Sequence, residues 1–145
     1  MKRSLRCALL AIVWLLINPA TAGELVVVAN ADSGAGKLSR DQVVNIFLGR
    51  FRQFPSGVVA EPIDQPEGGP LKAQFYRMLV DKEVAEINAY WARLIFSGRT
   101  NPPRKTASSS EVLQLLAARQ GAIAYMERAE VDHRVIVVFD PRHDR

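Results

Sequence analysis

The chain has 145 residues, of which 48% are hydrophobic and 23% are charged. This composition excludes an intrinsically disordered chain and favours one globular domain with a usable core. The formal net charge is +4, but without residues 1–22 the chain carries 16 basic and 15 acidic side chains. This balance argues against nucleic acid as a partner, because nucleic-acid binding needs a sustained basic surface.

Residues 1–22 have the pattern of an export signal. Basic residues precede an apolar run over 8–17, and small residues at 20–22 follow a break at Asn18. An apolar run of this length is too short to span a membrane, which takes about 20 residues. We therefore predict a signal peptide cleaved after Ala22, with an uncleaved N-terminal anchor as the alternative.

The predicted product, residues 23–145, is periplasmic and has no stable membrane insertion. The single cysteine, Cys7, lies in the segment that is removed. Disulfide and thiol chemistry are therefore excluded from the mature protein, even though its compartment permits disulfides.

The first half of the mature chain predicts a strand, a helix and a second strand. The run 25–29 is continuous and rich in β-branched residues, which is typical of a strand buried on both faces. Ser39 and Gln42 have capping-box spacing, and the helix that they begin should end at Gly49. A weaker strand is predicted over 58–63 and is limited by Pro62.

The second half predicts three helices, two strands and a tail. One helix begins near Pro70 and carries Leu71, Phe75 and Leu79, and the next has an apolar stripe over 84–95. A loop over 99–108 precedes a third helix, which begins at a second capping box and ends at Gly121. Strands follow over 122–125 and 135–139, and a polar tail over 140–145. The sequence thus predicts one α/β domain with a mainly buried central sheet flanked by helices.

The segment 33–37 superficially matches a phosphate-binding loop, but Leu38 stands where that motif needs Ser or Thr to hold magnesium. We interpret it as a flexible connection between strand and helix. The two histidines, His133 and His143, lie near three aspartates without the spacing of a metal site. We therefore expect no bound metal and no cofactor.

The sequence gives no signal for an enzyme, since no nucleophile elbow or thiol is available to the mature chain. Asp64 and Glu67 lie in a loop rich in proline and glycine, where acidic side chains are normally solvated turn residues. We expect them to be solvated and not to form a catalytic pair. No catalytic residue is predicted.

Three segments in order resemble the substrate-binding proteins of phosphate ABC transporters, which belong to the type 2 periplasmic-binding-protein superfamily. The first is 38–49, similar to the helix of that family that ends in Ile-Phe-x-Gly. The second is 63–75, which stands where the family has an Arg-x-Asp-Gly-Ser-Gly-Thr loop. The third is 121–125, close to Gly-Ala-Ile-Gly-Tyr. The likeness extends over about residues 24–139 and implies a single periplasmic-binding-protein-like lobe.

The resemblance implies a ligand site where the second segment enters its helix. In the family, this loop holds phosphate at a helix N-terminus, where free N–H groups and the helix dipole favour an anion. Here Gln65 stands at the position of the arginine, and Gly69, Pro70 and Leu71 replace the Ser, Gly and Thr. Lys72 is expected to supply a substitute cation. The candidate ligand-binding residues are Gln65, Gly68, Gly69 and Lys72.

The resemblance leaves two functions open. The chain is expected to be an exported solute-binding-like protein that binds phosphate or another small oxyanion weakly, as part of transport. The alternative is a ligand-free interaction module that recognises an envelope or transporter protein. The family's transport proteins close two lobes on their ligand, whereas residues 23–145 fit one lobe, so either a second chain completes the cleft or the lobe serves another purpose.

Overall fold

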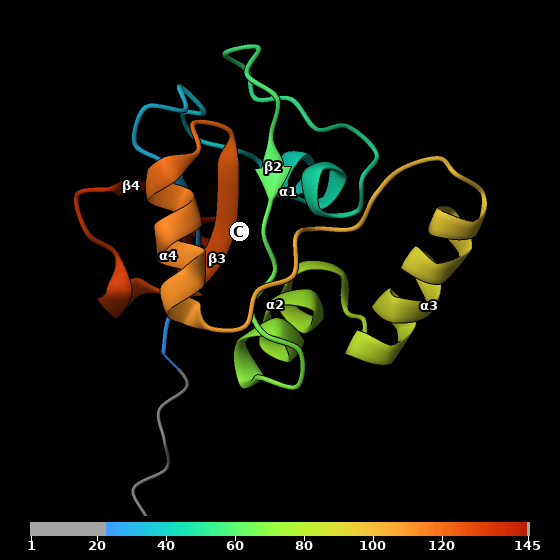
Figure 1. Cartoon of the computed structure of the whole chain (residues 1–145). Coiled ribbons are helices and arrows are strands. Elements are labelled where there is room, and N and C mark those ends of the chain that lie inside the picture. The colour runs from blue at the N-terminus through green and yellow to red at the C-terminus, as the bar shows by residue number, and fades with distance from the viewer. Residues whose placement is uncertain (1–22, 145) are drawn as a thin grey trace, which may run out of the picture.

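The computed structural model describes residues 23–144. The predicted signal peptide and its cleavage site at Ala22 lie outside the described residues. The elements in chain order are β1 (Leu25–Asn30), α1 (Arg40–Phe47), β2 (Glu61–Pro62), α2 (Pro70–Val80), α3 (Val84–Phe96), α4 (Ser109–Ala118), β3 (Ala122–Glu127), η1 (Arg128–Glu130), β4 (Val135–Phe139) and η2 (Pro141–His143). Figure 1 shows this arrangement.

The four strands form one sheet in the order β2-β3-β1-β4. The central strand β1 pairs antiparallel with both β3 and β4, and β2 pairs in parallel with β3. Alternate residues of β1 face opposite sides, because side chains alternate along a strand. Val26 and Val28 pack with α4, whereas Val27 and Ala29 join the core formed with α1, α2 and α3. The predicted strand that is buried on both faces is confirmed, and so is the α/β class.

Local sequence signals account for the helix starts. The Ser39 hydroxyl accepts a hydrogen bond from the Gln42 N–H, and the Gln42 side chain accepts one from Ser39, so the first capping box is complete. Pro70 occupies the first turn of α2, as predicted. Only one of the two hydrogen bonds of the second capping box is present. Ser108 caps the Glu111 N–H, but the Glu111 carboxylate accepts from Ala107 instead.

Several predicted elements differ from the structure: α4 ends at Ala118 and not at Gly121, and the predicted polar tail contains η2. The strand expected over 58–63 is regular only at Glu61–Pro62, and Pro62 has no N–H to continue a ladder. The stripe expected over 84–95 is only partly buried, since α3 buries Ile87 and Trp91 alone. Phe96, at the end of that helix, is 97% exposed. The 3.6-residue period was correct for the helix, but it does not determine how much of the stripe another element covers.

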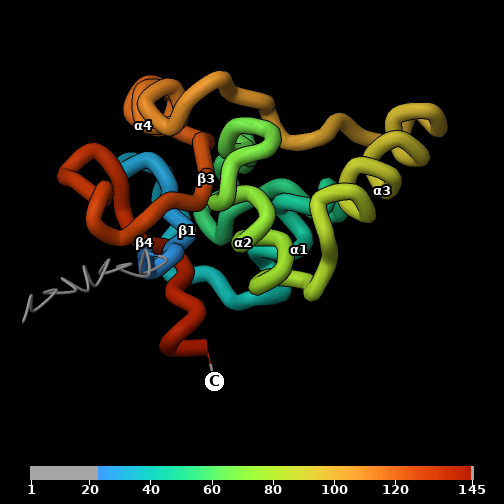
Figure 2. Tube along the Cα trace, turned by 90° about the horizontal axis from the view of Figure 1, so that it is seen from below, coloured from blue at the N-terminus to red at the C-terminus, as the bar shows by residue number. Residues whose placement is uncertain are grey.

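Helix α3 projects from the side of the domain, farthest from the sheet (Figures 1 and 2). Two contacts with the end of α1 hold it there. The Tyr90 hydroxyl donates to the carbonyl of Leu48 at 2.7 Å, and the buried Trp91 ring lies against Gly49. The Arg52 guanidinium lies 5.7 Å from the Trp91 ring centroid, within cation–π range.

Gly49 has a φ of +70°, and a Cβ there would lie 2.7 Å from the Trp91 ring. We expect Gly49→Ala to lower the free energy of unfolding by about 3 kcal/mol, from left-handed backbone strain plus overpacking. Gly36→Ala is the matched control, because Gly36 has a φ of +63° with nothing within 4 Å of the added Cβ. It should cost only the strain, about 1 kcal/mol.

Urea unfolding of both variants measures the difference. Equal losses of unfolding free energy in the two variants would show that the Trp91 ring of α3 is not in tight contact with Gly49.

Candidate functional site

The four predicted ligand-binding residues lie in the turn that joins β2 to α2 and in the first turn of α2, but only Gln65 and Gly69 line the hollow beside it, whereas Lys72 lines a separate hollow with Asp64 and Asn88. Gly68 has a φ of +77°, which favours glycine, and Gly69 is the residue before the first turn of α2. No side chain caps this helix. Beside the turn is a hollow of about 270 Å³, which we call the α2 hollow. It is lined by Gln65, Pro66, Gly69, Pro70, Leu71, Ser109, Glu127 and Glu130.

Gln65 is buried, and hydrogen bonds occupy both ends of its amide. Its Nε2 donates to the Tyr125 carbonyl at 2.8 Å, and its Oε1 accepts from the Ser109 hydroxyl at 2.9 Å. Its backbone N–H donates to the Tyr125 hydroxyl. Gln65 therefore ties the turn to β3 and to the start of α4. It stands at the position where the resembled family carries its arginine, but its polar atoms are already paired.

Lys72 is 3% exposed and lies between two carboxylates. Its Nζ is 3.4 Å from the Asp64 Oδ2 and 2.9 Å from the Glu67 Oε2. The Asn88 amide donates to the other Glu67 oxygen at 3.0 Å. These hydrogen bonds from Lys72 and Asn88 lower the pKa of Glu67. The ammonium predicted to supply a substitute cation is thus neutralised within the turn.

Asp64 is the buried centre of this arrangement, at 4% exposed. Its Oδ1 accepts hydrogen bonds from the Tyr76 hydroxyl at 2.9 Å and from the Tyr125 hydroxyl at 3.0 Å. The expectation of a solvated turn residue holds for the partly exposed Glu67 and is wrong for Asp64. The physical reason is that two buried tyrosines need hydrogen-bond acceptors, and the loop carboxylate supplies one.

Burial raises the pKa of Asp64, against the opposing effects of the Lys72 charge and the hydrogen bonds from Tyr76, Tyr125 and Lys72. Burial, together with the nearby Asp64 charge, also raises the pKa of each tyrosine well above its usual range. The hydroxyls therefore stay protonated and act as donors. Tyr125 stacks on Phe75 with ring centroids 3.8 Å apart, so these donors are fixed in a packed aromatic cluster.

The α2 hollow offers hydrogen bonds but little positive charge. An uncapped helix start presents free N–H groups, although Pro70 has none. Two carboxylates, Glu127 and Glu130, line the same hollow. The sequence did not predict that these two glutamates and Ser109 would line the hollow. Glu127 belongs to β3, Glu130 to η1 and Ser109 to α4, and all three elements lie far along the chain from the turn.

Within residues 23–144, no three His, Cys, Asp or Glu side chains lie close enough together to hold a metal ion. No helix of the same range is both long and apolar enough to cross a membrane.

The fold is similar to that of solved phosphate-binding proteins. One is a protein from Clostridium perfringens that is described as a phosphate ABC transporter substrate-binding protein and was solved with bound phosphate. Its TM-score is 0.64, with 14% sequence identity over 80% of this chain. An ABC-type phosphate transport receptor from Vibrio cholerae has a TM-score of 0.63 and 15% identity over 80% of this chain. A protein from Planctomyces limnophilus, described as phosphate-binding, has a TM-score of 0.54 and 11% identity.

The chain spans less than half the length of these structures, 44%, 45% and 40% respectively. No family model and no curated protein matches the sequence. The predicted periplasmic-binding-protein-like fold is confirmed by these similarities, which at such identities concern the fold alone.

Replacing Lys72 tests whether the buried ion pair is structural. Lys72→Met keeps the side-chain volume but leaves Asp64 a buried carboxylate without its cation, so we expect a loss of about 3 kcal/mol in the free energy of unfolding. Lys72→Met/Asp64→Asn removes both charges and should recover most of that loss. Lys105→Met, at an exposed lysine, is the control. A negligible loss in urea unfolding of Lys72→Met would contradict a structural role.

The raised pKa of Asp64 predicts a pH dependence. The folded protein holds the carboxyl proton more tightly than the unfolded chain, so this group's contribution to the free energy of unfolding falls as the pH rises from about 4 through the raised pKa. Asp64→Asn lacks that fall. The stability of the variant minus that of the wild type should therefore increase with pH across this window and then level off.

Urea titrations at several pH values measure this difference. Asp32→Asn, at an exposed aspartate, controls for the loss of one negative charge. A difference between Asp64→Asn and wild type that is constant from pH 4 to pH 8 would contradict the prediction.

Proposed function

We propose that the chain is an exported, solute-binding-like protein that binds a small oxyanion such as phosphate weakly. In this proposal residues 1–22 are a signal peptide, residues 23–145 form the periplasmic lobe, and a transporter or envelope protein is the partner. The observation that carries it is the uncapped start of α2, which opens beside the α2 hollow with Gly68 and Gly69 in its approach. This is the place where the resembled family binds phosphate.

The physical basis is the helix start itself. Free N–H groups of the first turn and the helix dipole attract an anion, and the two glycines leave room for close approach to the backbone. The solved similar proteins, which are described as phosphate-binding, support the class of ligand.

The expected affinity is low because the charges of the turn oppose an anion. Lys72 already serves Asp64 and Glu67, and two glutamates line the hollow. A phosphate here would rely on backbone N–H groups without a free cation from the turn. We expect a dissociation constant in the millimolar range, which corresponds to about 4 kcal/mol.

The same charges favour a second candidate, an interaction module that has kept the lobe without its ligand. The exposed end of α3, with Ile95 and Phe96, supports this reading, because large apolar side chains at a projecting helix end are suited to contact with another protein.

Phosphate titration separates the two candidates. We expect wild-type residues 23–145 to bind phosphate at millimolar concentration in low salt, and Glu127→Gln/Glu130→Gln to bind several-fold more tightly, since two repelling charges are removed. Asp32→Asn/Asp41→Asn makes the same change in net charge at exposed positions outside the hollow and should bind like the wild type.

Calorimetry or NMR titration of the three proteins gives the answer. Micromolar binding by the wild type would refute a weak site. Absence of binding in both the wild type and the double glutamate variant would refute the oxyanion proposal and leave the interaction module as the better one.

A further inference from the structure

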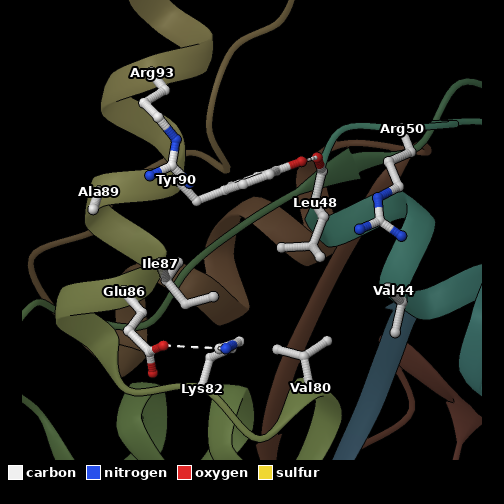
Figure 3. A pocket seen from close by; sticks show the side chains of 10 residues that line it. All are labelled: Val44, Leu48, Arg50, Val80, Lys82, Glu86, Ile87, Ala89, Tyr90 and Arg93. Carbon is white, nitrogen blue, oxygen red and sulfur yellow. Dashed lines mark hydrogen bonds and ion pairs between the residues drawn. The ribbon is translucent and has the colours of Figure 1, made fainter.

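A groove of about 500 Å³ lies between α1 and α3, away from the α2 hollow (Figure 3). We call it the α1–α3 groove. Its lining is largely apolar, with side chains from α1, from the end of α2 and from one face of α3. The residues that line it are Val44, Leu48, Arg50, Val80, Lys82, Glu86, Ile87, Ala89, Tyr90 and Arg93.

The charged side chains of this groove leave two cations uncompensated. Lys82 pairs with Glu86, the one acidic residue of the lining, at 3.1 Å. Neither Arg50 nor Arg93 takes part in an ion pair or a side-chain hydrogen bond within the described range 23–144. Figure 3 shows these two arginines on opposite sides of the groove, with Tyr90 and Leu48 between them. Two guanidinium groups thus flank an apolar floor.

The walls of the groove are fixed by the contacts that hold α3. The hydrogen bond from Tyr90 to the Leu48 carbonyl spans the groove from one wall to the other. Ile87 is buried in the core beneath, and Trp91 packs on Gly49 one turn further. The groove is therefore preformed, as small-molecule sites usually are, and its volume lies in the range of about 300–1,000 Å³ that is typical of such sites.

We propose that the α1–α3 groove binds an amphiphilic anion, a small molecule with an apolar chain that ends in a carboxylate. The chain would cover Val44, Leu48 and Ile87, and the carboxylate would accept hydrogen bonds from Arg50 or Arg93. A guanidinium matches a carboxylate with two parallel hydrogen bonds, which a point charge does not provide. Inorganic phosphate alone would leave the apolar floor uncovered. This inference is independent of the oxyanion site at α2.

Decanoate is the probe. We expect saturable binding to residues 23–145 with a dissociation constant of about 100 µM, which is ordinary for a ligand of this size. Decanol, which has the same chain without the charge, should bind at least tenfold more weakly. Of Arg50→Gln and Arg93→Gln, the variant that removes the arginine bound to the carboxylate should weaken decanoate binding about fivefold to tenfold, as expected for a lost charge-assisted hydrogen bond, and an unchanged affinity in both variants would overturn the proposal. Arg99→Gln is the matched control, at an exposed arginine outside the lining.

A second variant tests the place of the apolar chain. Ala89 is exposed and lines the edge of the groove on α3, so Ala89→Phe adds bulk there without disturbing the core and should weaken decanoate binding at least tenfold. Saturating phosphate should leave decanoate binding unchanged. Any of three other results would also overturn the proposal: no saturable decanoate binding, equal binding of decanol and decanoate, or binding that Ala89→Phe leaves intact.

Discussion

The structure depends on one buried carboxylate. Asp64 lies in the turn between β2 and α2, and burying its charge is tolerable only if it is paired and hydrogen-bonded. Tyr76 and Lys72 of α2 and Tyr125 of β3 all meet it there. The backbone carbonyl of Asp64 also accepts a hydrogen bond from Thr106, in the segment that leads to α4. One side chain and its peptide group therefore connect the sheet, α2 and the loop before α4.

The cation of this connection is Lys72 in the first turn of α2, next to the loop that the resembled family uses for phosphate. Lys72 cannot neutralise Asp64 and Glu67 and also serve a ligand without losing part of one interaction. Gln65 is committed in the same way, since its amide already joins β3 to the start of α4. The turn has two glycines and leads into an uncapped helix start, while Gln65 and Lys72 hold the surrounding elements together. In the proposed function an anion there would rely on backbone N–H groups, and for this reason the expected affinity is low.

The sequence predicts those structural features that depend only on residues close together in the chain. The complete capping box at Ser39, the proline in the first turn of α2 and the buried strand β1 depend on neighbours within a few positions, and all three are confirmed. The burial of Asp64 depends on Tyr76, 12 residues away, and on Tyr125, 61 residues away. A buried tyrosine hydroxyl needs a hydrogen-bond acceptor, but the sequence does not show which residue supplies it. The α1–α3 groove is likewise formed only when elements from separate parts of the chain meet.

Ligand recognition needs polar groups that the folded protein leaves uncompensated, and the described part of the chain distributes them unevenly. At the start of α2 the charged side chains of the turn already have partners. At the joint between α1 and α3, Arg50 and Arg93 lack ion pairs, and the buried Arg52 Nη2 and Trp91 Nε1 atoms lack hydrogen-bond partners. Each such buried atom costs roughly 1–3 kcal/mol of stability. Neither Arg52 nor Trp91 lines the α1–α3 groove, so only Arg50 and Arg93 bear on ligand binding there. Similarity of fold shows the architecture of the chain, whereas a binding site has to be argued from the polar groups that a region leaves uncompensated.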